Sequence, residues 1–287
     1  MVNRIVGAAV LAATLGSTSA LAANCAADAD EVNVKCYTTV QAAVDAALAA
    51  DRPLVLPRGT YQVTAPVVID YSRHAGTGFE LISRGATIDA TGSGGPALEI
   101  ICSKGSPTAP QGCFYFHQEG TLFVNADTNG YAVLIGQSDF SDAQNSIKID
   151  HLIVNNRNPG AQSGGVQFNY VLDSDVFIVA DAAGGAAGLD LRQLQFSTLK
   201  GAGSAAQGYS VAIEDGYVIA NVLQTIDQEA SPVCTLFTSP HAAGNTWTGY
   251  YQDCPTIDVL SPKALTGNTV TGGVIGGLAR EILRWSD

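Results

Sequence analysis

Charged residues are scarce in this chain, and basic residues are the scarcest of them. Only 14% of its 287 residues are charged, and 14 Lys and Arg stand against 26 Asp and Glu, which gives a formal net charge of −12. Nucleic-acid binding needs a basic surface, so this balance argues against nucleic acid as a partner. It also disfavours a strongly anionic substrate, unless a metal ion or a local group of Lys and Arg intervenes.

Long apolar runs are missing beyond the first residues of the chain. Residues 1–22 have the parts of a secretory signal peptide: Arg4 is the positive end, residues 5–15 are apolar, and Ala20-Leu21-Ala22 is a small-residue cleavage site. No later run approaches the ~20 apolar residues of a membrane-spanning helix. We therefore expect a protein that is secreted or periplasmic and has no membrane partner.

The cysteines lack the spacing of a metal site. No C-x-x-C sequence occurs and the four histidines are scattered, so zinc binding is the weaker interpretation. All six cysteines follow the predicted cleavage point and fall into three local pairs, which in an exported chain favours disulfides. The expected disulfides are Cys25–Cys36, Cys102–Cys113 and Cys234–Cys254.

Helical patterns are few, and strand patterns repeat. Val40, Val44 and Leu48 recur at helical spacing after a Thr38 or Thr39 N-cap. Later apolar runs are short, and those at 133–135, 166–168, 189–191 and 211–213 closely follow Gly130, Gly165, Gly188 and Gly208, at intervals of 35, 23 and 20 residues. A period slightly above twenty indicates a solenoid of parallel strands. An antiparallel sandwich also has many short strands, but it does not predict this glycine spacing or a capping helix before the first repeat.

The predicted organisation is one domain, residues 23–287, after the signal peptide. Residues 23–61 form an N-terminal cap, residues 62–277 form the coils, and residues 278–287 form a closing segment. The similar sequences GNTWTG at 244–249 and GNTVTG at 267–272 extend the coils toward the C-terminus. Leu278, Ile282 and Trp285 lie at the spacing of one face of a short closing helix.

Four segments near the N-terminus resemble a known group of proteins. They are TVQAAVDAA at 39–47, LVLPRGTY at 54–61, VVID at 67–70 and ATIDATG at 86–92. They are similar to the N-terminal cap and first turn of the pectate-lyase-like superfamily, which includes tailspike-type depolymerases and polygalacturonase-type glycoside hydrolases. The resemblance implies an all-β fold, a single-stranded right-handed parallel β-helix with an N-terminal capping helix. It also implies a secreted carbohydrate-active protein, and a homotrimer in the tailspike-like members. No catalytic signature of these families occurs in the chain, so no catalytic residue is carried over.

Polar residues of three successive turns are expected on one outer face, because side chains alternate between the two faces of a strand. These residues are Gln167, Asn169, Asp190, Arg192, Glu214 and Asp215. Asp190 and Glu214 would lie roughly 8 Å apart, which suits an inverting glycoside hydrolysis. Arg192 would hold a substrate group or lower the pKa of a neighbour. We predict Asp190, Glu214, Asp215 and Arg192 as catalytic; the alternative is a solvated face with an ordinary Arg192–Glu214 ion pair.

A second group of candidates lies on the strands that follow. Lys148 or His151, near Asp150, offers the base that a polysaccharide lyase needs. Asp173 and Asp175 are weak Ca²⁺ candidates, although the sequence Asp-Ser-Asp is more typical of a turn. The predicted substrate-binding residues are Gln167, Asn169, Tyr170, Lys148 and His151. Trp247, Tyr250 and Tyr251 are further candidates for sugar stacking, and His117 is expected on a strand surface.

These observations predict a glycoside hydrolase acting on a polysaccharide or oligosaccharide. Paired carboxylates need no cofactor, and Ca²⁺ enters only if the enzyme is a lyase. The rivals are a polysaccharide lyase that uses Lys148 or Arg192, and a glycan-binding or structural solenoid without catalysis. No metal site is predicted apart from the weak Ca²⁺ candidates.

Overall fold

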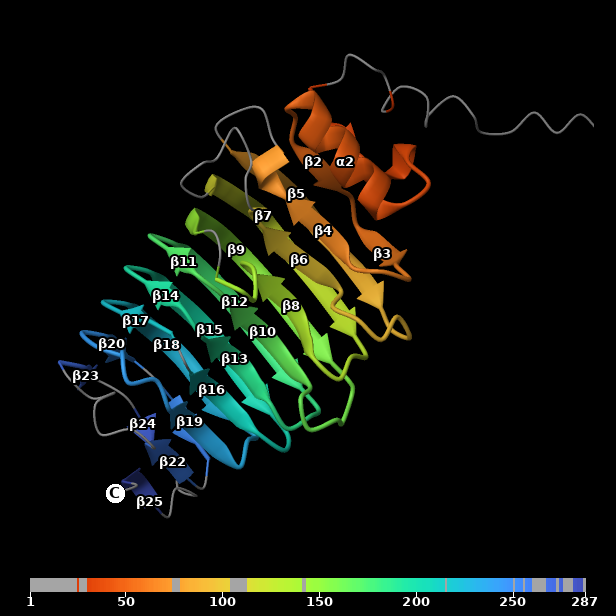
Figure 1. The fold of residues 1–287 in the computed structure, drawn as a ribbon. Coiled ribbons are helices and arrows are strands. Elements are labelled where there is room, and N and C mark those ends of the chain that lie inside the picture. Colours follow the sequence, from red (N-terminus) through yellow and green to blue (C-terminus); the bar gives the residue numbers. More distant parts are fainter. Residues whose placement is uncertain are drawn as a thin grey trace, which may run out of the picture.

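The chain folds as a parallel β-solenoid of about 7 turns. The computed structural model describes residues 25, 30–73, 78–103, 113–140, 143–214, 216–249, 251–254, 256–259, 267–271, 274–275 and 281–285. Figure 1 shows the turns stacked from the helical end of the chain to the C-terminus. The predicted signal peptide, residues 1–22, lies outside the described residues. Within the described ranges, no helix is long and apolar enough to cross a membrane.

Two parallel sheets form the walls of the solenoid, and each turn adds strands to both. Along sheet A the strands are β1 (Val32–Asn33), β2 (Leu54–Leu56), β5 (Phe79–Ala90), β7 (Cys113–Ala126), β9 (Gln144–Asn156), β12 (Asp175–Ala182), β15 (Thr198–Ala205), β18 (Val222–Glu229), β20 (Thr246–Thr248) and β23 (Thr269–Thr271). Along sheet B they are β4 (Val67–Asp70), β6 (Leu98–Ile101), β8 (Tyr131–Ile135), β10 (Gly164–Phe168), β13 (Ala187–Leu191), β16 (Tyr209–Ile213), β19 (Val233–Phe237), β22 (Thr256–Val259) and β25 (Glu281–Trp285).

Shorter elements pair beside these paths. β11 (Val171–Leu172), β14 (Leu194–Gln195) and β17 (Val218–Ile219) pair in succession, β3 (Gly59–Gln62) pairs with β5, and β21 (Tyr251–Asp253) pairs with β18 and β24 (Val274–Ile275). Two 3₁₀ turns, η2 (Val34–Cys36) and η3 (Tyr71–Arg73), lie near the N-terminus. All the described pairings between these strands are parallel, as expected for a chain that winds in one direction.

The predicted capping helix is α2 (Val40–Ala50), at the N-terminal end of the stack (Figure 1). The Thr39 hydroxyl caps it by accepting a hydrogen bond from the Ala42 N–H at 3.0 Å. Gln41 joins α2 to the first turn, since its side-chain amide donates to the Val68 carbonyl at 3.0 Å and accepts from the Val68 N–H at 2.7 Å. This amide thus pairs the backbone of an edge strand, where bare N–H and C=O groups invite aggregation.

The register of the central turns matches the predicted stacking. Val133 pairs with Val166, Val166 with Leu189, and Leu189 with Val211. These side chains are fully buried in one core that runs along the solenoid. Because a shift of one residue would turn every apolar side chain outward, burial of this column fixes the register of the outer face as well.

A column of hydroxyl and amide side chains, all buried except the half-buried Asn268, joins one corner of successive turns. Its members are Ser174, Ser197, Asn221, Asn245 and Asn268. Each backbone N–H of the first four donates to the side chain of the next member, at 2.9 to 3.1 Å. The residue before each member has a positive φ, between 47° and 66°. The left-handed turn directs the polar side chain inward, where it satisfies backbone groups that the sheets leave unpaired.

The three predicted disulfides, Cys25–Cys36, Cys102–Cys113 and Cys234–Cys254, are confirmed. The predicted closing helix is wrong for the part that is described. Residues 281–285 form β25, which pairs in parallel with β22. Pairing with the exposed edge of β22 satisfies more backbone groups than a helix of two turns could, and residues 276–280 lie outside the described ranges.

Replacing Asn221 by Ala should lower the free energy of unfolding by about 2–4 kcal/mol, because buried partners lose their hydrogen bonds. The Asn221 amide donates to the Leu194 carbonyl at 2.7 Å and to Asn245 Oδ1 at 2.9 Å. Urea unfolding of the two proteins measures the difference. Ser204→Ala is the control, because it removes one surface hydrogen bond, to Asp181 at 2.7 Å. Equal losses in the two variants would contradict the role of the column.

Candidate functional site

The outer face of sheet B gathers the polar residues that the sequence predicts. Gln167 of β10 pairs with Asp190 of β13, and Asp190 pairs with Ala212 of β16. Asn169, Arg192 and Glu214 follow two residues later on the same turns. The predicted grouping of these side chains is therefore correct. Asp215 lies outside the described residues, so its predicted role stays a prediction.

Asp190 is at the centre of this group and is 0% exposed. Its Oδ2 accepts hydrogen bonds from Gln167 Nε2 at 2.8 Å and from Arg192 Nε at 3.1 Å. Gln167 in turn accepts from Asn169 Nδ2 at 3.2 Å, and an Arg192 terminal nitrogen lies 3.7 Å from a Glu214 oxygen. The alternative interpretation, a solvated face, is wrong for Asp190, Gln167 and Asn169, which are all buried.

Tyr131 explains part of this burial. It lies on β8, two strands before Asp190, and its ring lies directly over Gly164, where a Cβ would collide with it. Burial and the negative charge of Asp190 raise the pKa of Tyr131 well above its ordinary value. Burial lowers the pKa of Arg192, but the charge of Asp190 and the hydrogen bond to it outweigh burial, so the pKa of Arg192 is raised. Asp190 and Arg192 thus form an ion pair that is shielded on the carboxylate side.

A cavity of about 440 Å³ opens beside this buried group, toward the N-terminal end of the same face. Its lining residues are Glu99, Ile101, Leu134, Gly136, Gln137, Ser138 and Asp139. Leu134 joins the cavity to the buried group, since it pairs with Glu99 on one side and Gln167 on the other. Burial raises the pKa of Glu99. The cavity is therefore lined by two carboxyl side chains, and burial holds the pKa of one of them, Glu99, above its ordinary value.

Neither carboxyl group of this cavity was predicted from the sequence, although a signal for one of them, Glu99, is present in the strand pattern. Glu99 belongs to the same outward column as Gln167 and Asp190, three strands before Asp190. Extending the column toward the N-terminus would have found it. Asp139 carries no such signal, because it lies in the loop after β8, outside the regular alternation of strand side chains.

The lyase candidates Lys148 and His151 lie on sheet A and do not join the group on sheet B, to which the other lyase candidate, Arg192, belongs. Lys148 and His117 are paired neighbours on β9 and β7. Asp150 lies 3.3 Å from Lys148 Nζ and 3.4 Å from His117 Nε2, and Glu80 lies 3.6 Å from the other His117 nitrogen. Burial alone would raise the pKa of Asp150. Hydrogen bonds from the Gly120 N–H, Lys148 and His117 together outweigh burial, so the pKa of Asp150 is lowered.

The other predicted candidates are dispersed. His151 packs against the edge of Phe177, with ring centroids 4.8 Å apart. Asp173 occupies a left-handed turn, and Asp175 pairs with Lys200 at 3.0 Å. In the part of the chain that the structure describes, no group of three or more His, Cys, Asp or Glu side chains is arranged to hold a metal ion.

The aromatic candidates differ in exposure. Trp247 is only 4% exposed and packs against Phe237, so its suggested role in sugar stacking is wrong. Tyr170 has a positive φ in the turn after β10 and is half-buried. The side chains of Tyr250 and Tyr251 lie outside the described ones. The large exposed rings are instead Phe114, Tyr115, Phe196 and Tyr217, together with the smaller exposed areas of Tyr37 and Phe123.

Replacing Arg192 by Met should destabilise the fold by about 3–5 kcal/mol, because Asp190 is left as a buried charge without its partner. Denaturant unfolding measures the loss, and the double variant with Asp190→Asn should recover part of it. Lys200→Met is the matched control, since it breaks the exposed pair with Asp175 and should cost less than about 1 kcal/mol. If Arg192→Met costs no more than the control, Asp190 is not held as a buried charge.

The chain matches no protein-family model, no curated protein and no solved structure. The likeness of residues 39–92 to the pectate-lyase-like superfamily therefore remains a resemblance carried by those residues. The parallel β-solenoid itself follows from the strand pairings.

Proposed function

We propose that this protein is a carbohydrate-active enzyme that hydrolyses glycosidic bonds in a polysaccharide or oligosaccharide. The observation that carries the proposal is the pair of carboxyl side chains, Glu99 and Asp139, in one cavity on the outer face of sheet B. Its volume, about 440 Å³, is in the range of small-molecule sites. We place the reaction here because the predicted catalytic Asp190 is buried and already bonded to Arg192.

The two carboxyl groups suit the two roles of glycoside hydrolysis. Burial raises the pKa of Glu99, which suits it to donate a proton to the glycosidic oxygen as that bond breaks. Asp139 accepts a proton from the water molecule whose oxygen forms the new bond to the anomeric carbon. Proton, water and leaving group are then balanced, and no cofactor is required.

Neighbouring turns extend the cavity into a binding surface. Gly136, which lines the cavity, has a φ of 89°, and a Cβ there would collide with the Asn169 carbonyl, so glycine lets the cavity turn lie close to the next turn. Beyond Asn169, the partly exposed side chains of Arg192 and Glu214 continue the same column of the sheet. Successive strands are about 4.8 Å apart, so a glycan that runs along the solenoid axis passes these groups in turn. In this proposal Asp190 is a positioning residue for Arg192.

Two alternatives to a glycoside hydrolase are a polysaccharide lyase and a glycan-binding solenoid without catalysis. A lyase needs a free base, whereas Lys148 and His117 both contact Asp150. A non-catalytic glycan-binding solenoid would use the same surface without turnover. Export, which the predicted signal peptide and the three disulfides support, and the homotrimer implied by the resemblance both remain predictions.

Glu99→Gln should lower the rate of glycan hydrolysis about 10²–10⁴-fold, because it removes the general acid. The wild-type rate should fall as the pH rises through the raised pKa of Glu99, since the ionised carboxyl has no proton to give. The variant should lose this alkaline decline. The measurement is release of reducing ends across a panel of polysaccharides, with absorbance of unsaturated products followed in parallel.

Asp175→Asn is the control, because it changes an exposed carboxyl on sheet A and should leave the rate unchanged. Reducing ends with unsaturated products would establish a lyase, and no products across the panel would favour the binding alternative. Full activity in the Glu99→Gln variant would contradict the proposal that Glu99 is the general acid and that this cavity is the active site.

A further inference from the structure

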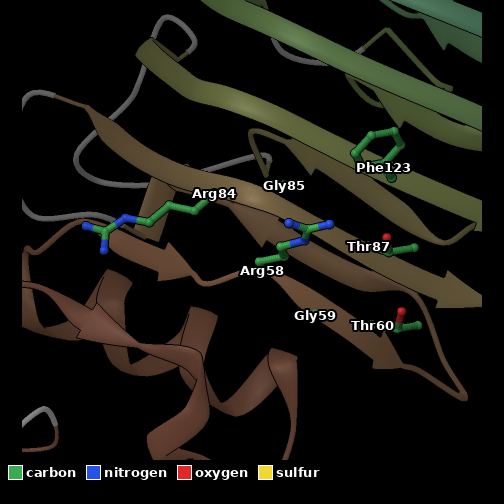
Figure 2. A pocket seen from close by; sticks show the side chains of 7 residues that line it. All are labelled: Arg58, Gly59, Thr60, Arg84, Gly85, Thr87 and Phe123. Carbon is green, nitrogen blue, oxygen red and sulfur yellow. The ribbon is translucent and has the colours of Figure 1, made fainter.

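A second cavity, of about 450 Å³, lies on the outer face of sheet A near its N-terminal end (Figure 2). Its lining residues are Arg58, Gly59, Thr60, Arg84, Gly85, Thr87 and Phe123, which we call the arginine groove. Two of the chain's 14 basic residues line this cavity, and none of the lining residues is acidic. We propose that the arginine groove binds a sugar that carries a carboxylate or sulfate group, independently of the cavity on sheet B.

The cation of the groove is available to a ligand. Arg58 has neither an ion pair nor a hydrogen bond with the described part of the chain, and Figure 2 shows its guanidinium extending toward Thr87. Arg84 points the other way, toward Glu31, from which it is separated by 3.9 Å. Arg58 is therefore the group that meets the oxyanion, and Arg84 adds positive charge at the rim. A guanidinium binds such groups through two parallel N–H bonds.

The walls of the groove fit a sugar ring. Thr60 pairs with Thr87, and Thr87 pairs with Phe123, so three outward side chains follow one another on adjacent strands, about 4.8 Å apart. Figure 2 shows the two threonine side chains on adjacent strands with Phe123 beyond them. Their hydroxyls can exchange hydrogen bonds with sugar hydroxyls. Phe123 is 37% exposed, which leaves ring surface for the apolar face of a sugar.

A bulge creates the hollow between these walls. The pairing of β5 with β7 shifts between Arg84 and Ala86, which leaves Gly85 as the extra residue. Gly85 has a φ of 75°, and a Cβ built there would meet nothing within 4 Å. The space above it is therefore open, and bulges of this kind commonly redirect side chains beside binding sites.

The negative net charge of the whole chain contrasts with the two arginines of the groove. At −12, the protein repels anions in general, so an anionic ligand needs a local group of basic residues to approach. The arginine groove supplies that group. Its hydroxyls and exposed ring distinguish it from a simple anion site, because a bare ion makes no use of them.

Isothermal titration calorimetry with glucuronate, glucose 6-sulfate, glucose and inorganic sulfate tests the proposal. The wild-type protein serves as the parent, because none of these ligands contains a glycosidic bond for it to cleave, and the result is therefore independent of the proposed function. At least one anionic sugar should bind more tightly than glucose and inorganic sulfate, and the tighter of the two sugars identifies the anion. Arg58→Gln should weaken that binding by about 10-fold or more, the value of a charged hydrogen bond.

Arg73→Gln is the matched control, because Arg73 is an exposed arginine that pairs with Asp45 at 3.1 Å, away from the groove. It should leave the affinity unchanged, whereas Phe123→Ala should weaken the anionic sugar and not inorganic sulfate. Equal binding of glucose would overturn the role of the anion. Equal binding of inorganic sulfate would overturn the role of the sugar. If an anionic sugar binds the Arg58→Gln variant as tightly as the parent protein, its site lies outside the arginine groove, and the proposal is overturned.

Discussion

The in-register stacking of successive turns is the constraint on which the rest of the molecule depends. Each inward column, such as Val133, Val166, Leu189 and Val211, must remain buried, and a slip of one residue would expose it. The buried serine and asparagine column at one corner ties the backbone of each turn to the next. Apolar burial and polar satisfaction therefore select the same register. Because inward and outward residues alternate, this register also decides which outward side chains become neighbours.

Burial then divides the outward residues into two groups with different roles. Where small residues such as Gly164 allow Tyr131 to lie across the face, the carboxylate of Asp190 is enclosed and held by Arg192. Toward the N-terminus the same face opens into the cavity, which begins at Leu134, one turn from Gln167, and includes Glu99, two turns from it. Sheet A repeats the contrast: ion pairs occupy the row around His117, whereas Arg58 lines an open groove. Charged side chains that line an open cavity can contact a ligand, whereas those held in ion pairs stabilise the fold.

Much of the fold follows from sequence, because strand alternation and repeat length are local properties. The helix at Val40, the disulfides and the pairing of Gln167 with Asp190 are of this kind. The burial of Asp190 is different, since it depends on a tyrosine from an earlier turn and on the absence of a side chain at Gly164. The cavity depends on a loop residue, Asp139, outside the strand pattern. The corner column was not predicted either, because two serines and then three asparagines fill the same structural position, so no single residue type repeats.

The most direct measurement is a crystal structure of the Glu99→Gln variant with an oligosaccharide that the wild-type protein cleaves. The account predicts a sugar in the cavity on sheet B, with its glycosidic oxygen facing residue 99 and a water molecule beside Asp139. The chain of the glycan should continue past Asn169 toward Arg192. A sugar bound elsewhere, with this cavity empty, would contradict the claim that the register of the solenoid builds the active site on this face.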